Sequence, residues 1–396
     1  MTALGVGFVL LPVALFVYAY FAYPLLLRLL ASDPRPSGLP GGTAAEAAGE
    51  SFDWPAVSVS LPAYNEEERL AGTLDALLAL DYPQDRLEIV VVSDASSDAT
   101  DEIAASYADR GVRLLRLPER GGKVAAENFA ASRLSHPIVV NTDATIRIPP
   151  EALKPLVRAF ADPTVGVASG RDVSVASVRD EANQAESGYV GYEMRVRALE
   201  TRAGGIVGAS GCFYAILREL HEPPFPPHLS RDFASCLIAR EHGYRSVSVD
   251  EAVCFVPRTG SLAREYRRKV RTMARGLATL SFKRSLLDPF SYGRFAWMLW
   301  SHKLARWLVP LTTPVALLAL GGLALGGHRA AAGLLAVAAA GVVAGGVAWR
   351  WAERGTAPGP VSSLGYAFAA NFAGLAAWWR FLTSGSQAVW EPTRRR

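Results

Sequence analysis

Polar side chains cluster at three points along the sequence, each directly after an apolar stretch. The clusters are PAYNE at 62–66, SDASSD at 93–98 and NTDAT at 141–145. Carboxylates and hydroxyls of this kind can bind a divalent cation and the phosphates of a nucleotide. Any one cluster alone is as readily a turn or a helix cap. Three of them in succession predict one polar crevice.

The segments around these clusters alternate between strand and helix patterns. Strands are predicted at 57–62, 87–94, 112–117 and 136–143, and helices at 67–80, at 98–108 and from Lys123. This alternation predicts an α/β domain with a mostly parallel, doubly wound sheet. Ligands of such sheets lie at the carboxyl ends of the strands, which is where the three clusters occur.

The sequence motifs of other common nucleotide-binding and hydrolytic sites are absent from the chain. The chain has no Walker-type phosphate loop, no Gly-x-Gly-x-x-Gly and no Gly-x-Ser-x-Gly. The three cysteines are scattered and the six histidines have no ligand spacing. A disulfide framework or a structural zinc site is therefore not expected.

Long apolar runs at both ends of the chain predict a membrane protein. The run 1–27 can cross a bilayer, and Arg28 and Arg35 after it place the following domain in the cytoplasm. Further runs cover 307–327, 330–349 and 361–379. The last is short and followed by a basic tail, so it is expected to be re-entrant or interfacial. We predict three or four spans in the inner (plasma) membrane.

The segment before the second apolar region is basic and amphipathic. Between residues 264 and 303 there are ten Lys or Arg residues and only two acidic residues, Glu265 and Asp288. This predicts contact with anionic lipid or an anionic substrate rather than nucleic acid. Trp297, Trp300 and Trp307 are expected to anchor it at the membrane interface.

Together these patterns divide the chain into five parts. They are an N-terminal transmembrane helix (1–30), a linker (31–54), the α/β domain (55–256), basic interfacial helices (257–303) and a C-terminal membrane region (304–396).

The motifs PAYNEEERL, VVSDASSDAT and RGGKVAAEN follow one another as in a known family. Their order and spacing resemble the membrane-bound family 2 glycosyltransferases, which have a GT-A catalytic domain. The hyaluronan, chitin-oligosaccharide, cellulose and poly-N-acetylglucosamine synthases look most similar. The resemblance runs from about residue 57 to 280.

The resemblance implies a nucleotide-sugar site, with a UDP-sugar as the expected donor. Its contacts would be Ala63, Tyr64, Glu66, Asp94, Lys123, Asn128 and Asp143. Tyr64 would stack on the base, and Asp94 would accept a hydrogen bond from the base imide, which favours uracil. Lys123 would meet the diphosphate, because two glycines before it expose backbone N–H groups at a helix start. The alternative for Lys123 is a solvated helix residue.

Asp143 matches the first acid of the family's Asp-x-Asp element, which binds Mg²⁺ or Mn²⁺. Thr145 stands where the second acid is expected. Magnesium often takes one or two protein carboxylates and completes its shell with phosphates and water, so one Asp can suffice. Thr145 could donate to a phosphate or to a metal-bound water.

Asp232 occupies the position of the family's general base. The residue before it is Arg231 rather than Glu. An adjacent cation would keep the carboxylate ionised but weaken it as a base. The alternative for Asp232 is a helix cap.

The acceptor is expected between two further segments. Small residues in GASGCFYAI (208–216), among them Ser210 and Gly211, would let a sugar approach the backbone. Arg268 and Arg271 match the basic part of the family's Gln-x-x-Arg-Trp element, whose Gln and Trp are missing here. They are expected to stabilise the departing diphosphate, while a basic helix lying on lipid is the alternative.

The resemblance therefore predicts an inverting transferase that extends a polysaccharide and is coupled to export. One alternative is a non-processive enzyme that adds one sugar to a polyprenyl-phosphate or other lipid-linked acceptor. Another is a catalytically impaired partner that binds nucleotide or glycan, as Thr145, Arg231 and Thr272 would allow. The sugar, the linkage and the oligomeric state do not follow from the sequence.

Overall fold

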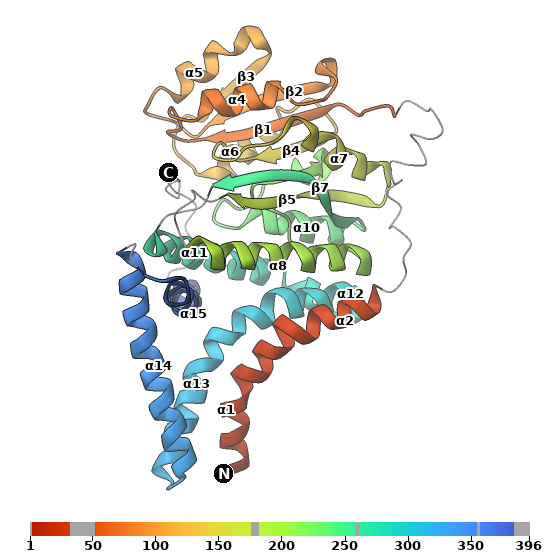
Figure 1. Cartoon of the computed structure of the whole chain (residues 1–396). Coiled ribbons are helices and arrows are strands. Elements are labelled where there is room, and N and C mark those ends of the chain that lie inside the picture. The colour runs from red at the N-terminus through yellow and green to blue at the C-terminus, as the bar shows by residue number, and fades with distance from the viewer. Residues whose placement is uncertain (1, 32–51, 176–181, 258–260, 355–356, 384–396) are drawn as a thin grey trace.

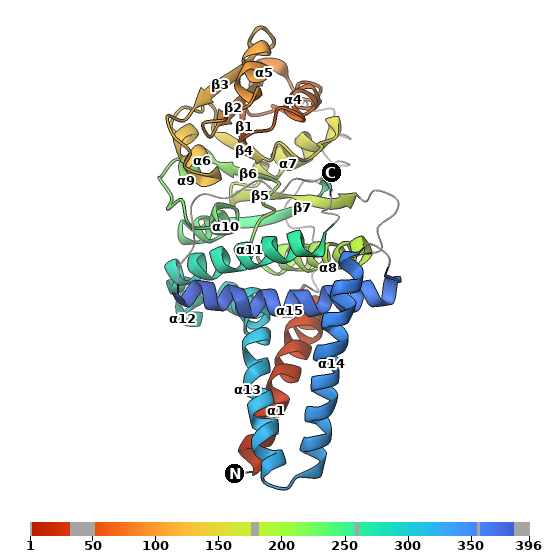
Figure 2. The same ribbon diagram turned by 90° about the vertical axis from the view of Figure 1, so that its left-hand side faces the viewer.

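A computed structural model describes residues 2–31, 52–175, 182–257, 261–354 and 357–383. An α/β domain lies at one end of the molecule and a group of long helices at the other (Figure 1). Between them lies a layer of helices that run across the long axis (Figure 2).

One seven-stranded sheet, in the order β3-β2-β1-β4-β6-β5-β7, forms the centre of the domain. Its strands are β1 Val57–Ala63, β2 Leu87–Ser93, β3 Val112–Arg116, β4 Ile138–Thr142, β5 Val165–Val175, β6 Phe213–Leu217 and β7 Arg245–Pro257. The pairs β1–β2, β1–β4, β2–β3 and β5–β7 are parallel, and β6 is antiparallel to both of its neighbours. The mostly parallel α/β sheet predicted from the sequence is confirmed.

Helices cover both faces of the sheet because strand side chains alternate between them. Val91 packs on one face with α4 (Leu70–Leu78) and α7 (Leu153–Arg158). Its neighbours Val90 and Val92 pack on the other face with α6 (Lys123–Ala131) and α10 (Arg231–Glu241). Two further helices belong to the domain: α5 Thr100–Ser106 and α9 Arg218–His221.

The adjacent parallel strands β2, β1 and β4 end at the same edge of the sheet. Ala63 of β1 pairs in register with Ser93 of β2, and Ser60 of β1 pairs with Asn141 of β4. The polar clusters that follow these strands are therefore neighbours in space, as their positions in the sequence predicted.

A layer of helices joins this domain to the apolar helices. It contains α2 Tyr23–Leu30, α8 Ala182–Ala203, α11 Leu262–Phe282, α12 Pro289–Leu299 and α15 Gly359–Thr383. A shared apolar cluster ties the layer to α10, with Tyr23 of α2, Val196 of α8, Phe233 of α10 and Met298 of α12 among its members.

Among the described residues, three helical stretches are long and apolar enough to cross a membrane. They are Ala3–Leu30, Pro289–Leu325 and Arg329–Glu353. The first joins α1 (Thr2–Val17) to α2, and the second joins α12 to α13 (Ala305–Leu325), through π-helical turns at Tyr18–Ala22 and Trp300–Leu304. The third is α14 (Arg329–Glu353). The last apolar run instead forms α15, which crosses the domain-facing ends of the three (Figure 2). The expectation that this run is re-entrant or interfacial stays a prediction.

Candidate active site

One cavity of about 460 Å³ lies between the polar edge of the sheet and the layer of helices that joins the domain to the apolar helices. Its walls include Ala63, Tyr64, Glu66, Asp94, Lys123, Asp143, Ser210, Gly211, Asp232, Arg268 and Arg271. These are all the site residues predicted from the sequence except Asn128. The fold thus brings together positions as far apart in the sequence as Ala63 and Arg271.

Asp94 holds the loop that starts α6. Its Oδ1 accepts a hydrogen bond from Gly121 N at 2.7 Å and its Oδ2 accepts one from Gly122 N at 2.9 Å. Gly122 has φ +90°, in the left-handed region that favours glycine. Each carboxylate oxygen has a second lone pair, so Asp94 can still accept a hydrogen bond from a nucleotide base.

Lys123 bridges two walls of the cavity. Its Nζ donates to Asp143 Oδ1 at 2.5 Å and to the Gly211 carbonyl at 2.9 Å. Burial alone would lower the pKa of Lys123, but the carboxylates of Asp143 and Glu127 raise it above its ordinary value. Lys123 is therefore a fixed ammonium group beside the predicted position of the phosphates.

Tyr64 has a cationic neighbour that the sequence did not reveal. The Arg120 guanidinium lies 3.9 Å from the centroid of the Tyr64 ring, a cation–π contact. A nucleotide base that stacks on Tyr64 would either bind the other face of the ring or displace the Arg120 guanidinium.

Asp232 lies in the first turn of α10, where the helix dipole favours a negative charge. The N-cap residue of this helix is Ser230, so the alternative of Asp232 as the cap is wrong. Ser230 Oγ donates to Asp232 Oδ1 at 2.7 Å. A Cβ on Gly211 would lie 2.7 Å from Asp232 Oδ2, which places the carboxylate against the predicted acceptor loop.

Arg231 has a different role from the one expected. Its buried guanidinium donates to the Asn128 side chain and to the carbonyl of His221, rather than to Asp232. Asn128 also exchanges two hydrogen bonds with the Phe225 backbone, at 2.7 and 3.0 Å. Asn128 therefore joins α6 to α10 and does not line the cavity. Its expected contact with the donor stays a prediction.

Glu127 is a cavity residue that sequence reasoning missed. It is buried, lies one helical turn after Lys123, and has an Oε1 4.0 Å from Lys123 Nζ. Its Oε2 has no hydrogen-bond partner among the described residues. Burial raises the pKa of Glu127 above its ordinary value although Lys123 and Arg231 oppose the shift. The i, i+4 spacing from Lys123 was the available signal.

Trp307 is a second missed cavity residue. It was expected to be an interface anchor, but it lines the cavity and packs against Gly276 of α11. Its ring centroid lies 5.9 Å from that of Phe233, the residue after Asp232. Trp307 and Phe233 thus form an aromatic wall near the part of the cavity where the acceptor is expected, even though Thr272 replaces the tryptophan of the family's motif. Trp300, by contrast, is 45 % exposed, as an anchor would be.

The basic face of α11 borders the same cavity. Arg268 makes two contacts of 2.7 Å with Glu265, and Arg275 donates to the Pro227 carbonyl at 3.0 Å. Arg268, Arg271 and Arg275 recur at intervals of three or four, so one helix face presents all three to the cavity.

Comparison with known proteins accounts for this arrangement. The model of "Glycosyl transferase family 2" matches residues 58–223. An N-acetylglucosaminyltransferase of Mesorhizobium japonicum is 26% identical over 254 residues, 60% of this chain and 59% of its own. A poly-beta-1,6-N-acetyl-D-glucosamine synthase of Staphylococcus epidermidis is 29% identical over 161 residues, 40% of this chain and 38% of its own. Residues 58–223 form a glycosyltransferase family 2 domain.

A solved structure extends the likeness of this glycosyltransferase to its apolar helices. The mannosyltransferase PcManGT from Pyrobaculum calidifontis, in complex with GDP-Man and Mn²⁺, is 26% identical with a TM-score of 0.66. The match covers 95% of this chain and 99% of that one. The curated relatives are matched over a smaller share, about a quarter to three fifths of their own length. The GT-A fold predicted from the sequence is confirmed.

The glycosyltransferase offers few ligands for a metal ion. The described residues contain no group of three His, Cys, Asp or Glu side chains that could hold one. Asp143 faces the cavity, and its Oδ1 is engaged by Lys123. This donor set fits Mg²⁺ or Mn²⁺ only when nucleotide phosphates and water complete the shell. Asp143 is the residue that would hold such an ion, which would neutralise charge on the leaving diphosphate.

Proposed function

We propose that this glycosyltransferase transfers one sugar from a nucleotide-sugar donor to a lipid-linked acceptor at the membrane surface. One observation carries the proposal. The cavity that contains Asp94 and Asp143 continues to Trp307 of α13 and Tyr366 of α15. A donor bound at the strand ends and an acceptor held beside the apolar helices would therefore meet in one space.

Some of the comparisons support a lipid-linked acceptor, while the poly-beta-1,6-N-acetyl-D-glucosamine synthase supports the polysaccharide export that the sequence resemblance favoured. PcManGT matches nearly the whole of both chains, including the helices around the cavity end. A beta-monoglucosyldiacylglycerol synthase of Synechocystis is 29% identical over 47% of this chain. A dolichyl-phosphate beta-glucosyltransferase of Drosophila melanogaster is 33% identical over 28%. The names of the last two specify lipid-borne sugars.

The chemistry we propose is a direct displacement at the anomeric carbon with inversion. Asp232 accepts the proton of the acceptor hydroxyl, which attacks the sugar as the bond to the diphosphate breaks. Lys123 and the arginines Arg268 and Arg271 bind the diphosphate and stabilise its growing charge. No covalent intermediate is needed, because a nucleoside diphosphate is already a good leaving group.

The donor we propose is a UDP-sugar, with Asp94 as the acceptor for the base imide. Nucleotide sugars are used in the cytoplasm, so we propose a multi-pass protein of the plasma membrane with its α/β domain on the cytoplasmic side. Arg350 near the end of α14 and Arg354 after it support this orientation.

Incubation of the purified protein with labelled UDP- and GDP-sugars, Mn²⁺ and a membrane lipid extract tests the function. We expect one labelled product that partitions into organic solvent and carries one added sugar. A ladder of polymer lengths would instead support the polysaccharide synthase. Donor binding without turnover under any of these conditions would favour an impaired binding partner.

A further inference from the structure

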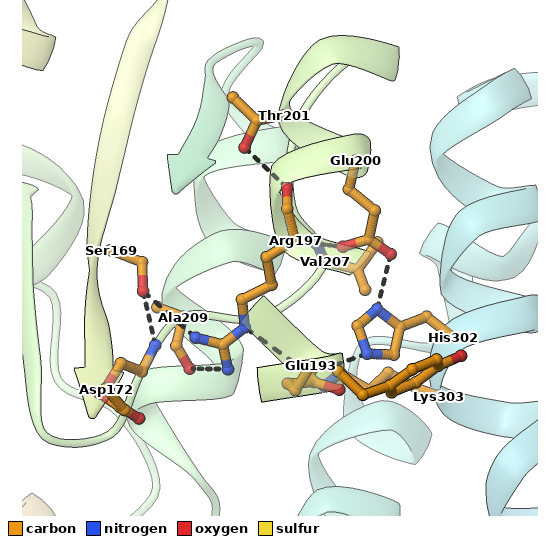
Figure 3. A network of polar contacts seen from close by, with 12 residues as sticks. Ser169, Asp172, Glu193, Arg197, Glu200, Thr201, Val207, Ala209, His302 and Lys303 are labelled. Atoms are coloured by element: carbon orange, nitrogen blue, oxygen red, sulfur yellow. Dashed lines mark hydrogen bonds and ion pairs between the residues drawn. The ribbon is translucent and has the colours of Figure 1, made fainter. Parts of the chain in front are cut away.

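A network of buried charged groups borders the membrane end of the cavity. Glu193, Arg197 and Glu200 of α8 meet His302 and Lys303, which lie in the π-helical turn before α13 (Figure 3). The mechanism proposed above uses none of these side chains.

Hydrogen bonds hold the two carboxylates of the network. Glu193 contacts His302 Nε2 and Arg306 Nη1, each at 2.9 Å. Glu200 contacts His302 Nδ1 at 2.6 Å and accepts a hydrogen bond from the hydroxyl of Tyr23 at 2.5 Å. Arg197 and Lys303 lie further from Glu193, each with a nitrogen 3.6 Å from Oε1.

Two cations of this network face the cavity and are only loosely paired. Arg197 and Lys303 both line the cavity, and each has a nitrogen 3.6 Å from Glu193 Oε1. Asp172, which also lines the cavity, is a further carboxylate near Arg197. Burying a cation without a close partner is costly, so an anion bound in the cavity would be stabilised by contact with these two groups.

Lys303 packs against the acceptor loop and Phe233. Its Cε and Nζ are 3.2 and 3.3 Å from where a Cβ on Gly208 would stand, and its Nζ lies 5.8 Å from the centroid of the Phe233 ring. Phe233 directly follows Asp232. The same end of the cavity has apolar and aromatic walls, formed by Val190, Met194, Trp307 and Tyr366. Cationic groups beside such walls suit a ligand with an anionic head and an apolar chain.

We propose that Lys303, with Arg197 behind it, binds the phosphate of the lipid-linked acceptor. The acceptor is then a sugar carried on a lipid phosphate or diphosphate rather than an uncharged glycolipid. This inference rests on the proposed function and narrows its acceptor class. A charge-assisted contact with phosphate orients the acceptor so that its hydroxyl meets Asp232.

The test compares two acceptors that carry the same sugar, one on a short isoprenyl diphosphate and one on the corresponding isoprenyl alcohol. Wild type, Lys303→Met and Lys303→Arg are assayed with both acceptors. Lys283→Met is the matched control, since Lys283 pairs with Glu241 at 2.6 Å and does not line the cavity. Donor affinity, measured without acceptor, reports that each variant retains its fold.

We expect wild type and Lys283→Met to prefer the diphosphate acceptor. Lys303→Met should raise its KM at least about tenfold, and Lys303→Arg should keep most of the preference. Donor affinity should stay unchanged in all variants. Preference for the uncharged acceptor, or an unchanged KM in Lys303→Met, would overturn the inference and leave the proposed function intact. Failure to use any lipid-linked acceptor would overturn both.

Discussion

Gly211 lies against Asp232 so closely that a Cβ on the glycine would stand 2.7 Å from Asp232 Oδ2. The contact sets the position of the proposed base relative to the acceptor loop. Gly211→Ala should therefore move the carboxylate and reduce kcat by about ten- to a hundredfold, since small misplacements at a reacting centre are costly. Steady-state kinetics would measure this.

The control for this change is Gly72→Ala. No atom lies within 4 Å of a Cβ placed on Gly72, so kcat should be unaffected there. A Gly211→Ala enzyme with the wild-type kcat would show that Asp232 is not required in its observed position.

Lys123→Met should weaken donor binding. Lys123 is the buried cation between Asp143 and the Gly211 carbonyl, and its loss removes a charge-assisted contact with the diphosphate. The dissociation constant for the nucleotide sugar should rise about tenfold or more. Calorimetric titration would measure it. The control is Lys154→Met, which removes an exposed ion pair with Asp81 at 2.7 Å and should leave donor affinity unchanged.

The metal requirement should depend on Asp143 and respond to Thr145. Asp143→Asn should abolish stimulation by Mn²⁺, because it removes the proposed carboxylate ligand. Thr145→Asp adds the second carboxylate and should lower the Mn²⁺ concentration that gives half-maximal activity. Titration of Mn²⁺ into chelator-treated enzyme measures both. Full wild-type activity in the presence of excess chelator would remove the ion from the proposed mechanism.

Glu127 should make stability depend on pH. Its pKa is raised in the folded protein, so the folded state favours the protonated form. The stability gained from this is present below the ordinary pKa of Glu and is lost as pH rises through the raised value. Glu127→Gln keeps a neutral group at every pH and should escape this loss.

Thermal unfolding of both proteins between about pH 4 and pH 8 measures the effect. The melting temperature of Glu127→Gln should exceed that of wild type by about 2–4 °C per kcal/mol at neutral pH. The difference should shrink toward acid pH. A constant difference across the range would contradict the raised pKa.

Local patterns were sufficient to predict the first half of the domain. The strands β1, β2, β3 and β4 lie within one or two residues of the predicted ranges, because their apolar runs are bounded by turn residues. The parallel arrangement then determines that the ends of β1, β2 and β4 meet. The helix predicted at 67–80 is shorter, since α4 begins only at Leu70 after a turn.

Features that depend on distant contacts could not be predicted. Asn128 looked like a donor ligand from its position near Lys123, but its amide bonds to Phe225, 97 residues away. Trp307 looked like a membrane anchor because it lies in an apolar run, and only packing against Gly276 turns it toward the cavity. The antiparallel direction of β6 likewise follows from the path of the chain between strands.

The most direct test of the proposed mechanism is the turnover of Asp232→Asn. The purified variant is assayed with the nucleotide sugar and a lipid-linked acceptor, and donor affinity is measured in parallel. We expect kcat to fall by about 10²- to 10⁴-fold while donor affinity stays within error of wild type. Turnover equal to that of wild type would contradict the assignment of Asp232 as the base.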